Sequence, residues 1–446
     1  MAPAGLYDGL FRDPTVSRIL DDTQRIQRLL MVERALTEAL ARAGLCTEAD
    51  AQAVSAALAR FQPDMDAISA GMAQDGVPLP TLIKALKAEI PAVHHRALHH
   101  GATSQDIMDT ASVLESRELL DHFERQIRQL VQGLAALTAQ HRNQLVAGRT
   151  RSQQGAPMNL GLKIVRWLAP LVRQLERLQS LRPRLLKVQL AGAVGNLSAL
   201  QNQAIPVRQA LAEQLQLAAD GGWHTQRDSL QELATWLAIT TTALGKMAHD
   251  WMLMAQTEVG EIRFANGGGS STLPQKSNPV NAELIQTLAR RSAHQAAEML
   301  QAGLGAHERD GVSWSSEWLA LPELYHCTGA ALHQSLMGLQ HMEFNPVRLQ
   351  QNLWQSRGLL FAETLRFRLH SGQPAGIDAA LLLRQSIDAV NQNPDSPETL
   401  IERINTAAGT AFTAAELEAD LLHAGCTDPD IDRILQAAQI WMPADD

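Results

Sequence analysis

Aromatic residues are scarce in this chain, and their scarcity is the first constraint on its fold. Phe, Trp and Tyr together make up 4% of the 446 residues, with only two tyrosines. Leucine, alanine, glutamine, glutamate and arginine are abundant instead, and these residues favour helices, whereas aromatic residues favour strands. The composition excludes a β-sandwich or barrel. It predicts an all-α protein whose 45% hydrophobic residues suffice for a buried core.

Cysteine and positive charge are also in short supply. Cys46, Cys327 and Cys426 are far apart and form no CxxC pair, so we expect a reduced, cytoplasmic environment. The net charge is −9 and no long basic run interrupts it, which argues against a nucleic-acid partner. An anionic ligand would therefore need local positive charge or helix N-termini at its site.

Long apolar runs are missing as well. No apolar stretch reaches 18 residues, and the first residues contain no basic segment followed by an apolar one. We therefore expect neither membrane insertion nor export.

The N-terminal part carries the pattern of a capped helix. Asp13 and Pro14 match an N-cap and a first-turn proline, and apolar residues then recur at helical spacing up to Gly44. This pattern predicts a capped amphipathic helix over that stretch.

Longer helical patterns follow. Apolar seams cover residues 120–137 and 160–178, and Pro170 inside the second seam should bend the helix without ending it. Residues 229–259 contain no proline and one glycine. A helix of that length, about 45 Å, is typical of a central rod in a helical bundle.

The chain length and these patterns suggest three domains. We expect an N-terminal helical domain over residues 1–101, a central long-helix bundle over 102–355, and a small C-terminal helical domain over 356–446. The last region has shorter helical segments, separated by HSGQPAG and NQNPDSP.

One loop concentrates polar groups suited to chemistry. Residues 266–279, NGGGSSTLPQKSNP, combine glycines, serines, a lysine and asparagines before a predicted helix with Pro279 in its first turn. A flexible connector would have a similar composition. A phosphate-binding loop is a weaker alternative, because the lysine is misplaced for GxxxxGK[ST].

The same loop resembles the GSSxMPxKxNxxxxE signature of the fumarase/aspartase superfamily. The match runs from Gly269 to Asn278, with Glu283 five residues later and Leu273 in place of methionine. Other segments of the family occur in order: HHGATSQDIMDT (99–110), RPRLL (182–186), GAVG (192–195), WHTQRD (223–228), QTEVGE (256–261), HER (307–309) and EWLALP (317–322). The resemblance covers roughly residues 5–360, and within the superfamily it is most similar to the bacterial 3-carboxy-cis,cis-muconate cycloisomerase family.

The resemblance implies a fumarase/aspartase-like, three-domain helical fold with a long central bundle, and a shared chemistry. Members move a proton at the carbon beside a carboxylate, through an aci-carboxylate that bears two negative charges. Ser270, the first serine of the signature, would be the base, and the acid in the reverse direction. Its alkoxide needs neighbouring donors and positive charge. Lys276 and Asn278 would bind a substrate carboxylate. No metal or organic cofactor is implied.

Further side chains are placed around the substrate by the resemblance: Thr103, Ser104, Gln105, His99, Thr150, Arg151, Gln153, Gln154, Ser271 and Arg309. Three further residues would hold these side chains in place: Glu283, Asp106 and His224. Thr103 and Asp106 also fit a plain capped helix start, which can itself bind an anion. The histidines at 94, 95, 99 and 100 could alternatively suggest zinc, but no HExxH pattern or cysteine pair supports a metal site.

The chain departs from the family pattern at one functional place. Relatives carry a THLQxAxP-like segment, whereas residues 150–157 are TRSQQGAP. Gln154 and Arg151 thus replace family histidines, and glutamine does not titrate near neutral pH. This loss fits lactone formation, in which the nucleophile is an ionised substrate carboxylate. Alternatively, specificity has changed and Arg151 pairs with an additional anionic group.

The resemblance therefore implies an intramolecular lyase that converts 3-carboxy-cis,cis-muconate to 4-carboxymuconolactone in the degradation of aromatic compounds. A differently substituted muconate, such as 3-sulfomuconate, or a substituted succinate is the alternative substrate. A structural, crystallin-like role is a third alternative, against which the retained signature residues argue. The expected partners are a small polycarboxylate substrate and further copies of the chain, in a homotetramer whose sites are shared between subunits.

Overall fold

The computed structural model describes residues 5–269, 271–371 and 378–442 and divides the chain into two compact units. Unit 1 comprises Met1–Arg125, Gln174–Thr242 and Thr287–His333, and unit 2 comprises Gln126–Arg173, Ala243–Gln286 and Gln334–Asp446. Helices dominate both units, so the predicted all-α class is confirmed. The predicted division into three domains stays a prediction.

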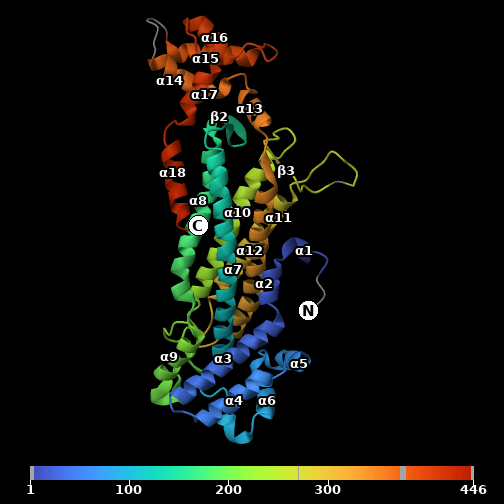
Figure 1. Cartoon of the computed structure of the whole chain (residues 1–446), viewed down its shortest axis with the longest axis vertical. Helices are drawn as coiled ribbons and strands as arrows, with labels where there is room; N and C mark the ends of the chain where they lie inside the picture. Colours follow the sequence, from blue (N-terminus) through green and yellow to red (C-terminus); the bar gives the residue numbers. More distant parts are fainter. Residues whose placement is uncertain (1–4, 270, 372–377, 443–446) are drawn as a thin grey trace. The chain divides into compact units, whose positions relative to one another are not determined.

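Five long helices contribute residues to both units (Figure 1). They are α7 (Ser104–Gln140), α8 (Leu160–Leu185), α10 (Asp228–Met254), α11 (Val280–Ala302) and α12 (Gly311–His341). The first two confirm the apolar seams of the sequence, and α8 is continuous across Pro170. Among the residues that the structure describes, no helix combines the length and apolar character needed to cross a membrane.

The third predicted rod ends earlier than expected. Helix α10 ends at Met254, whereas the sequence pattern predicted a helix as far as residue 259. The N–H groups of Val259 and Gly260 both donate to the carbonyl of Gln256, and Gly260 has a φ of 60°. A turn with a left-handed glycine thus replaces the last helical turn.

Unit 1 adds the shorter N-terminal helices and the segment before α10. They are α1 (Asp8–Phe11), α2 (Pro14–Ile19), α3 (Asp22–Arg42), α4 (Glu48–Arg60), α5 (Met65–Asp75), α6 (Leu79–Glu89), η1 (Ala92–Ala97), η2 (Ser198–Gln203) and α9 (Ala204–Leu215). Helix α3 packs against α4 and α9 around fully buried Leu36 and Leu40, which lie on the predicted apolar stripe (Figure 1).

The predicted first helix is in fact two helices. Asp13 caps α2 as expected, since its side chain accepts a hydrogen bond from the N–H of Val16. The helix then ends at Ile19, and the side chain of Asp21 caps α3 by accepting from Thr23. The second cap was hidden in the sequence because the apolar spacing continues across the break.

Unit 2 adds two small antiparallel sheets and the C-terminal helices. They are β1 (Leu145–Thr150), β2 (Gln153–Asn159), β3 (Ile262–Phe264), β4 (Met342–Phe344), α13 (Pro346–Trp354), η3 (Leu359–Phe361), α14 (Ala362–Ser371), α15 (Ala379–Gln392), α16 (Leu400–Ala408), α17 (Ala414–Leu422) and α18 (Thr427–Gln439). Strand β1 pairs with β2, and β3 with β4. The short C-terminal helices agree with the sequence pattern, whereas the sheets were not predicted.

Candidate functional site

The start of α7 is anchored by Asp106. Its buried carboxylate accepts hydrogen bonds from the N–H of Thr103 at 2.9 Å and from the N–H groups of Ala191 and Gly192 at 2.8 and 2.9 Å. The amide of Gln189 donates a fourth, at 2.9 Å. Burial raises the pKa of Asp106 even though these donors oppose the shift. Asp106 therefore fixes the helix start to residues 189–192, and its supporting role at the substrate site stays a prediction.

Three predicted site residues meet beside this anchor. Gln105 is buried, its amide nitrogen donates to the carbonyl of His224 at 3.1 Å, and its amide oxygen accepts from Nε of Arg309 at 2.8 Å. Arg309 also donates to the carbonyl of Gly192 at 3.4 Å. Burial lowers the pKa of His224. Gln105 thereby holds the Arg309 guanidinium in place, and all three residues line a small pocket of about 30 Å³.

His99 lies in the same unit and has a partner that sequence analysis missed. Its Nδ1 is 2.5 Å from Oε1 of Glu33, a fully buried residue of α3. Burial by itself lowers the pKa of His99, but the hydrogen bond and charge of Glu33 outweigh burial and raise the pKa.

The other histidines of this region have separate partners. Nδ1 of His94 is 2.8 Å from Asp50, and Nε2 of His95 is 2.8 Å from the carbonyl of Ile90. Within the described ranges, no three His, Cys, Asp or Glu side chains are grouped as metal ligands would be.

A buried ionic network lies next to the small pocket. Arg227 donates to Asp109 at 2.6 Å and to Glu317 at 2.8 Å, and Nε1 of Trp314 donates to Asp109 at 3.2 Å. All three charged side chains are at least nine-tenths buried. The two carboxylates raise the pKa of Arg227 against the effect of burial, so the guanidinium is permanently charged. Sequence analysis identified Arg227 only as part of a family segment.

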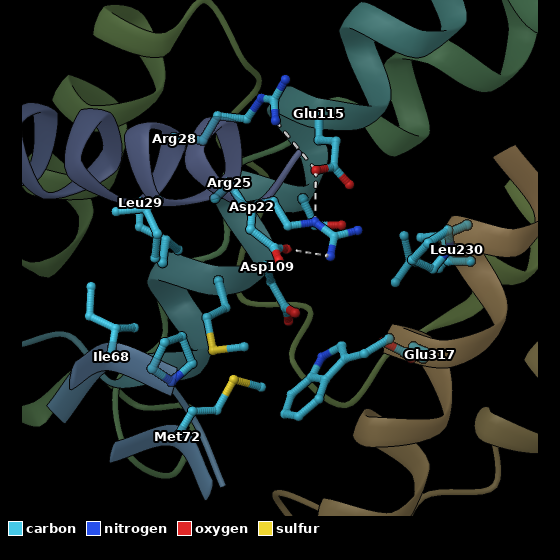
Figure 2. A pocket seen from close by; sticks show the side chains of 18 of the residues that line it. Asp22, Arg25, Arg28, Leu29, Ile68, Met72, Asp109, Glu115, Leu230 and Glu317 are labelled. Carbon is cyan, nitrogen blue, oxygen red and sulfur yellow. Dashed lines mark hydrogen bonds and ion pairs between the residues drawn. The ribbon is translucent and has the colours of Figure 1, made fainter. Parts of the chain in front are cut away.

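A larger cavity of about 320 Å³ shares Arg227 and Glu317 with the small pocket. Its walls are mainly apolar and include Leu29, Ile68 and Leu230 (Figure 2). Figure 2 also shows Glu115 beside two arginines of the lining; Oε2 of Glu115 is 3.4 Å from Nε of Arg25 and 3.3 Å from Nη1 of Arg28. These three charges of the lining are thus paired with one another.

In unit 2, the segment that departs from the family pattern forms the β1–β2 hairpin. Thr150 pairs with Gln153, and Arg151 and Ser152 form the two-residue turn with φ of 50° and 65°. Positive φ at both positions is the geometry of a type I′ turn. Arg151 is exposed at the tip. The amide of Gln154 donates to the carbonyl of Asn352 at 3.3 Å.

The signature loop also belongs to unit 2. Gly268 and Asn278 exchange two backbone hydrogen bonds of 2.9 and 2.8 Å that close the loop. Ser271 and Lys276 are exposed on it, and Glu283 is exposed in the first turn of α11. Ser270, the predicted base, lies outside the described residues.

The predicted site residues thus fall into two groups, one in each unit. Unit 1 holds three residues of the first turn of α7, two that precede this helix and two from later segments: Ser104, Gln105, Asp106, His99, Thr103, His224 and Arg309. Unit 2 holds the hairpin and the signature loop: Thr150, Arg151, Gln153, Gln154, Ser271, Lys276, Asn278 and Glu283.

Comparison with known proteins places the chain among characterised relatives. A family model described as "Lyase" matches residues 12–292. The chain is 36% identical over 379 residues to the 3-carboxy-cis,cis-muconate cycloisomerase of Acinetobacter baylyi, covering 82% of this chain and 84% of the relative. It is 30% identical over 404 residues to the N-acetyl-S-(2-succino)cysteine lyase of Dickeya dadantii, covering 88% and 87%. The crystal structure of the 3-carboxy-cis,cis-muconate lactonizing enzyme from Pseudomonas putida matches with a TM-score of 0.89 at 33% identity, covering 98% of this chain and 99% of that chain.

Proposed function

Because this chain belongs to the lyase family of the fumarase/aspartase superfamily, we propose that it is a cycloisomerase that converts 3-carboxy-cis,cis-muconate to 4-carboxymuconolactone. The observation that carries this proposal is the similarity to a cycloisomerase over about four-fifths of both chains. The signature residues Ser270, Lys276 and Asn278 are all retained. In this proposal the chain acts in protocatechuate degradation in the cytoplasm.

The chemistry requires one new C–O bond and one new C–H bond. A substrate carboxylate oxygen adds to a carbon of the diene, and the electron pair moves to the carbon beside another carboxylate, which becomes an aci-carboxylate. Ser270 then gives its hydroxyl proton to that carbon and recovers a proton from solvent. A trianion and one proton thus become a dianionic lactone. Lys276, Asn278 and helix N-termini would stabilise the charge of the intermediate.

The β1–β2 hairpin supports cyclisation over elimination of a poor leaving group. Gln154 cannot supply a proton near neutral pH, and its amide already donates to the carbonyl of Asn352. Because the nucleophile is an ionised substrate carboxylate, cyclisation needs no second acid at this position. Arg151 would instead bind one of the three substrate carboxylates.

Loss of the diene absorbance of 3-carboxy-cis,cis-muconate provides the direct assay. We expect Ser270→Ala to lower the rate by a factor of at least about 10²–10³, because the proton donor is lost. Ser180→Ala is the matched control. The hydroxyl of Ser180 donates to the carbonyl of Glu176 on an exposed part of α8, so this variant should keep wild-type turnover. Near-normal turnover of Ser270→Ala would refute the role of Ser270.

A substituted succinate is the second candidate substrate, and the similarity to a succinocysteine lyase over 88% of this chain favours it. Comparing kcat/KM for 3-carboxymuconate, 3-sulfomuconate and N-acetyl-S-(2-succino)cysteine separates the candidates. Highest kcat/KM for the succinate derivative would replace the cycloisomerase proposal.

The proposal includes a homotetramer whose sites are shared between subunits. Four chains of 48.6 kDa give roughly 190 kDa in light scattering. A stable, active monomer would contradict shared sites.

A further inference from the structure

His99 is held in an unusual backbone conformation. Its φ is 56°, in the left-handed region that residues with a side chain rarely adopt, so the backbone is strained there. In this backbone conformation, Nδ1 of the ring lies 2.5 Å from Oε1 of Glu33. The ring remains about one-fifth exposed, whereas the Glu33 side chain is fully buried.

Glu33 is buried, although glutamate usually lies at the protein surface. It lies between Leu29 and Leu36 on the apolar stripe of α3, and the hydroxyl of Thr37 donates to its backbone carbonyl, not to its carboxylate. Among the described residues, its Oε2 has no hydrogen-bond partner. A buried carboxylate with a single partner is costly unless that partner supplies a proton or a positive charge.

The number of protons on the His99–Glu33 pair determines whether Nε2 of His99 can donate a hydrogen bond to a ligand. With two protons, the pair is either an imidazolium with a carboxylate or a neutral imidazole with a carboxylic acid. Nδ1 faces Glu33 in both forms, so Nε2 carries a hydrogen in both. With one proton, Nδ1 donates to the Glu33 carboxylate and Nε2 becomes an acceptor. Only the two-proton form can donate a hydrogen bond to an anionic ligand through Nε2.

We propose that Glu33 is a positioning residue that keeps the second proton on the pair, so that Nε2–H of His99 donates to a substrate carboxylate. This inference rests on the proposed function, because it takes the ligand of His99 to be a carboxylate. The raised pKa of His99 agrees with it. Asp106 on α7 also favours the protonated imidazole, and Lys87 on α6 opposes it. Glu33 is the partner in direct contact.

The pH dependence of Glu33→Gln tests the proposal. The wild-type pair should lose its second proton at a higher pH than an unperturbed histidine does, and substrate binding weakens as that proton is lost. In Glu33→Gln, burial of His99 acts without the opposing carboxylate, so the alkaline limb of kcat/KM should shift by at least about one unit toward acid. At a pH where the variant has lost this proton and the wild type keeps it, the KM should rise by up to about tenfold with a smaller change in kcat. A wild-type pH profile in Glu33→Gln would overturn the proposal.

A second carboxylate–histidine pair of unit 1 provides the matched control. Asp50 is buried and contacts Nδ1 of His94 at 2.8 Å, and neither residue is a predicted site residue. Asp50→Asn makes the same carboxylate-to-amide change, so it should keep the wild-type pH profile even if it lowers the melting temperature. A shift as large as that of Glu33→Gln would overturn the specific role of Glu33.

A substrate-free measurement separates this inference from the proposed function. NMR titration of the histidine ring protons in the full-length protein, with the His99 signal assigned through His99→Gln, should give a pKa that falls in Glu33→Gln. If Glu33→Gln does not fold, Glu33→Asp, which keeps the charge, should retain the raised pKa. An unchanged His99 pKa in Glu33→Gln, or an ordinary one in Glu33→Asp, would overturn the inference. Failure to turn over 3-carboxymuconate would affect only the proposed function.

Discussion

Arg149 and Glu261 form a two-pronged ion pair inside unit 2. Nη2 of Arg149 donates to Oε1 of Glu261 at 2.7 Å, and Nη1 donates to Oε2 at 3.0 Å. Glu261 is fully buried, and its Oε1 also accepts from the amide of Asn352 at 2.9 Å. The Asn352 carbonyl in turn accepts from Gln154. This network therefore connects both strands of the hairpin to Glu261, which follows α10, and to Asn352 in α13.

Removing the cation of this pair should destabilise the protein. Arg149→Met leaves the buried Glu261 carboxylate with Asn352 but without its ion-pair partner, and we expect the free energy of unfolding to fall by about 3–5 kcal/mol. Arg263→Met is the control, because Arg263 pairs with Glu343 at the surface and its side chain is 76% exposed; it should cost less than about 1 kcal/mol. Urea denaturation measures both. Equal losses would show that burial does not strengthen the Arg149 pair.

The Arg227 network predicts a pH-dependent loss of stability. Burial already raises the pKa of Glu317, and Arg227→Met would raise it further while leaving Asp109 and Glu317 close together. A carboxyl group with a raised pKa in the folded state binds more protons there than in the unfolded state. Stability therefore falls as the pH rises toward the folded-state pKa. We expect Arg227→Met to lose about 3–5 kcal/mol at pH 8 and clearly less at pH 5. Melting temperatures at both pH values, compared with wild type, measure the difference; an equal loss at pH 5 and 8 would contradict it.

Local patterns in the sequence predicted the helices well. The seams of α7 and α8 and the N-cap at Asp13 depend on residues within a few positions of one another, and the structure confirms all three. The signature loop was identified from its motif alone. The hairpin was missed because its turn residues, Arg151 and Ser152, are not the Asn-Gly or Asp-Gly pair that normally marks a type I′ turn.

The pairs of buried charges could not be predicted, because the partners are far apart in the sequence. Glu33 and His99 are 66 positions apart, and Arg149 and Glu261 are 112 apart. One signal was available: Glu33 occupies the apolar stripe of a predicted amphipathic helix, where a charged residue must have a partner. The stripe marks the glutamate but does not identify the histidine.

Arg151 should control recognition of the third substrate carboxylate. Its exposed position at the hairpin tip means that Arg151→Gln removes a charge with little effect on stability. We expect KM for the tricarboxylate 3-carboxymuconate to rise about tenfold, the effect of one lost charge-assisted contact, and KM for the dicarboxylate cis,cis-muconate to change less. Steady-state kinetics with both substrates tests this expectation. Equal changes would mean that Arg151 does not distinguish the third carboxylate.

Gly195 provides a way to displace His224 without mutating it. Gly195 has a φ of 94°, and a Cβ atom there would lie 2.6 Å from Cε1 of the His224 ring. Gly195→Ala therefore combines backbone strain with a clash that displaces the imidazole of the residue whose backbone carbonyl accepts from Gln105. Since Gln105 also holds Arg309, we expect kcat/KM to fall by about tenfold or more.

Gly221→Ala separates the two effects. Gly221 has a φ of 72°, but a Cβ atom there would meet no other atom within 4 Å. Both alanine variants should lose about 1 kcal/mol of stability from the backbone conformation, and only Gly195→Ala should also lose activity. Melting temperatures and kcat/KM for the two variants provide the comparison. Full activity of Gly195→Ala would mean that the position of His224 does not matter for Gln105 and Arg309, whereas loss of activity in both variants would attribute the effect to strain alone.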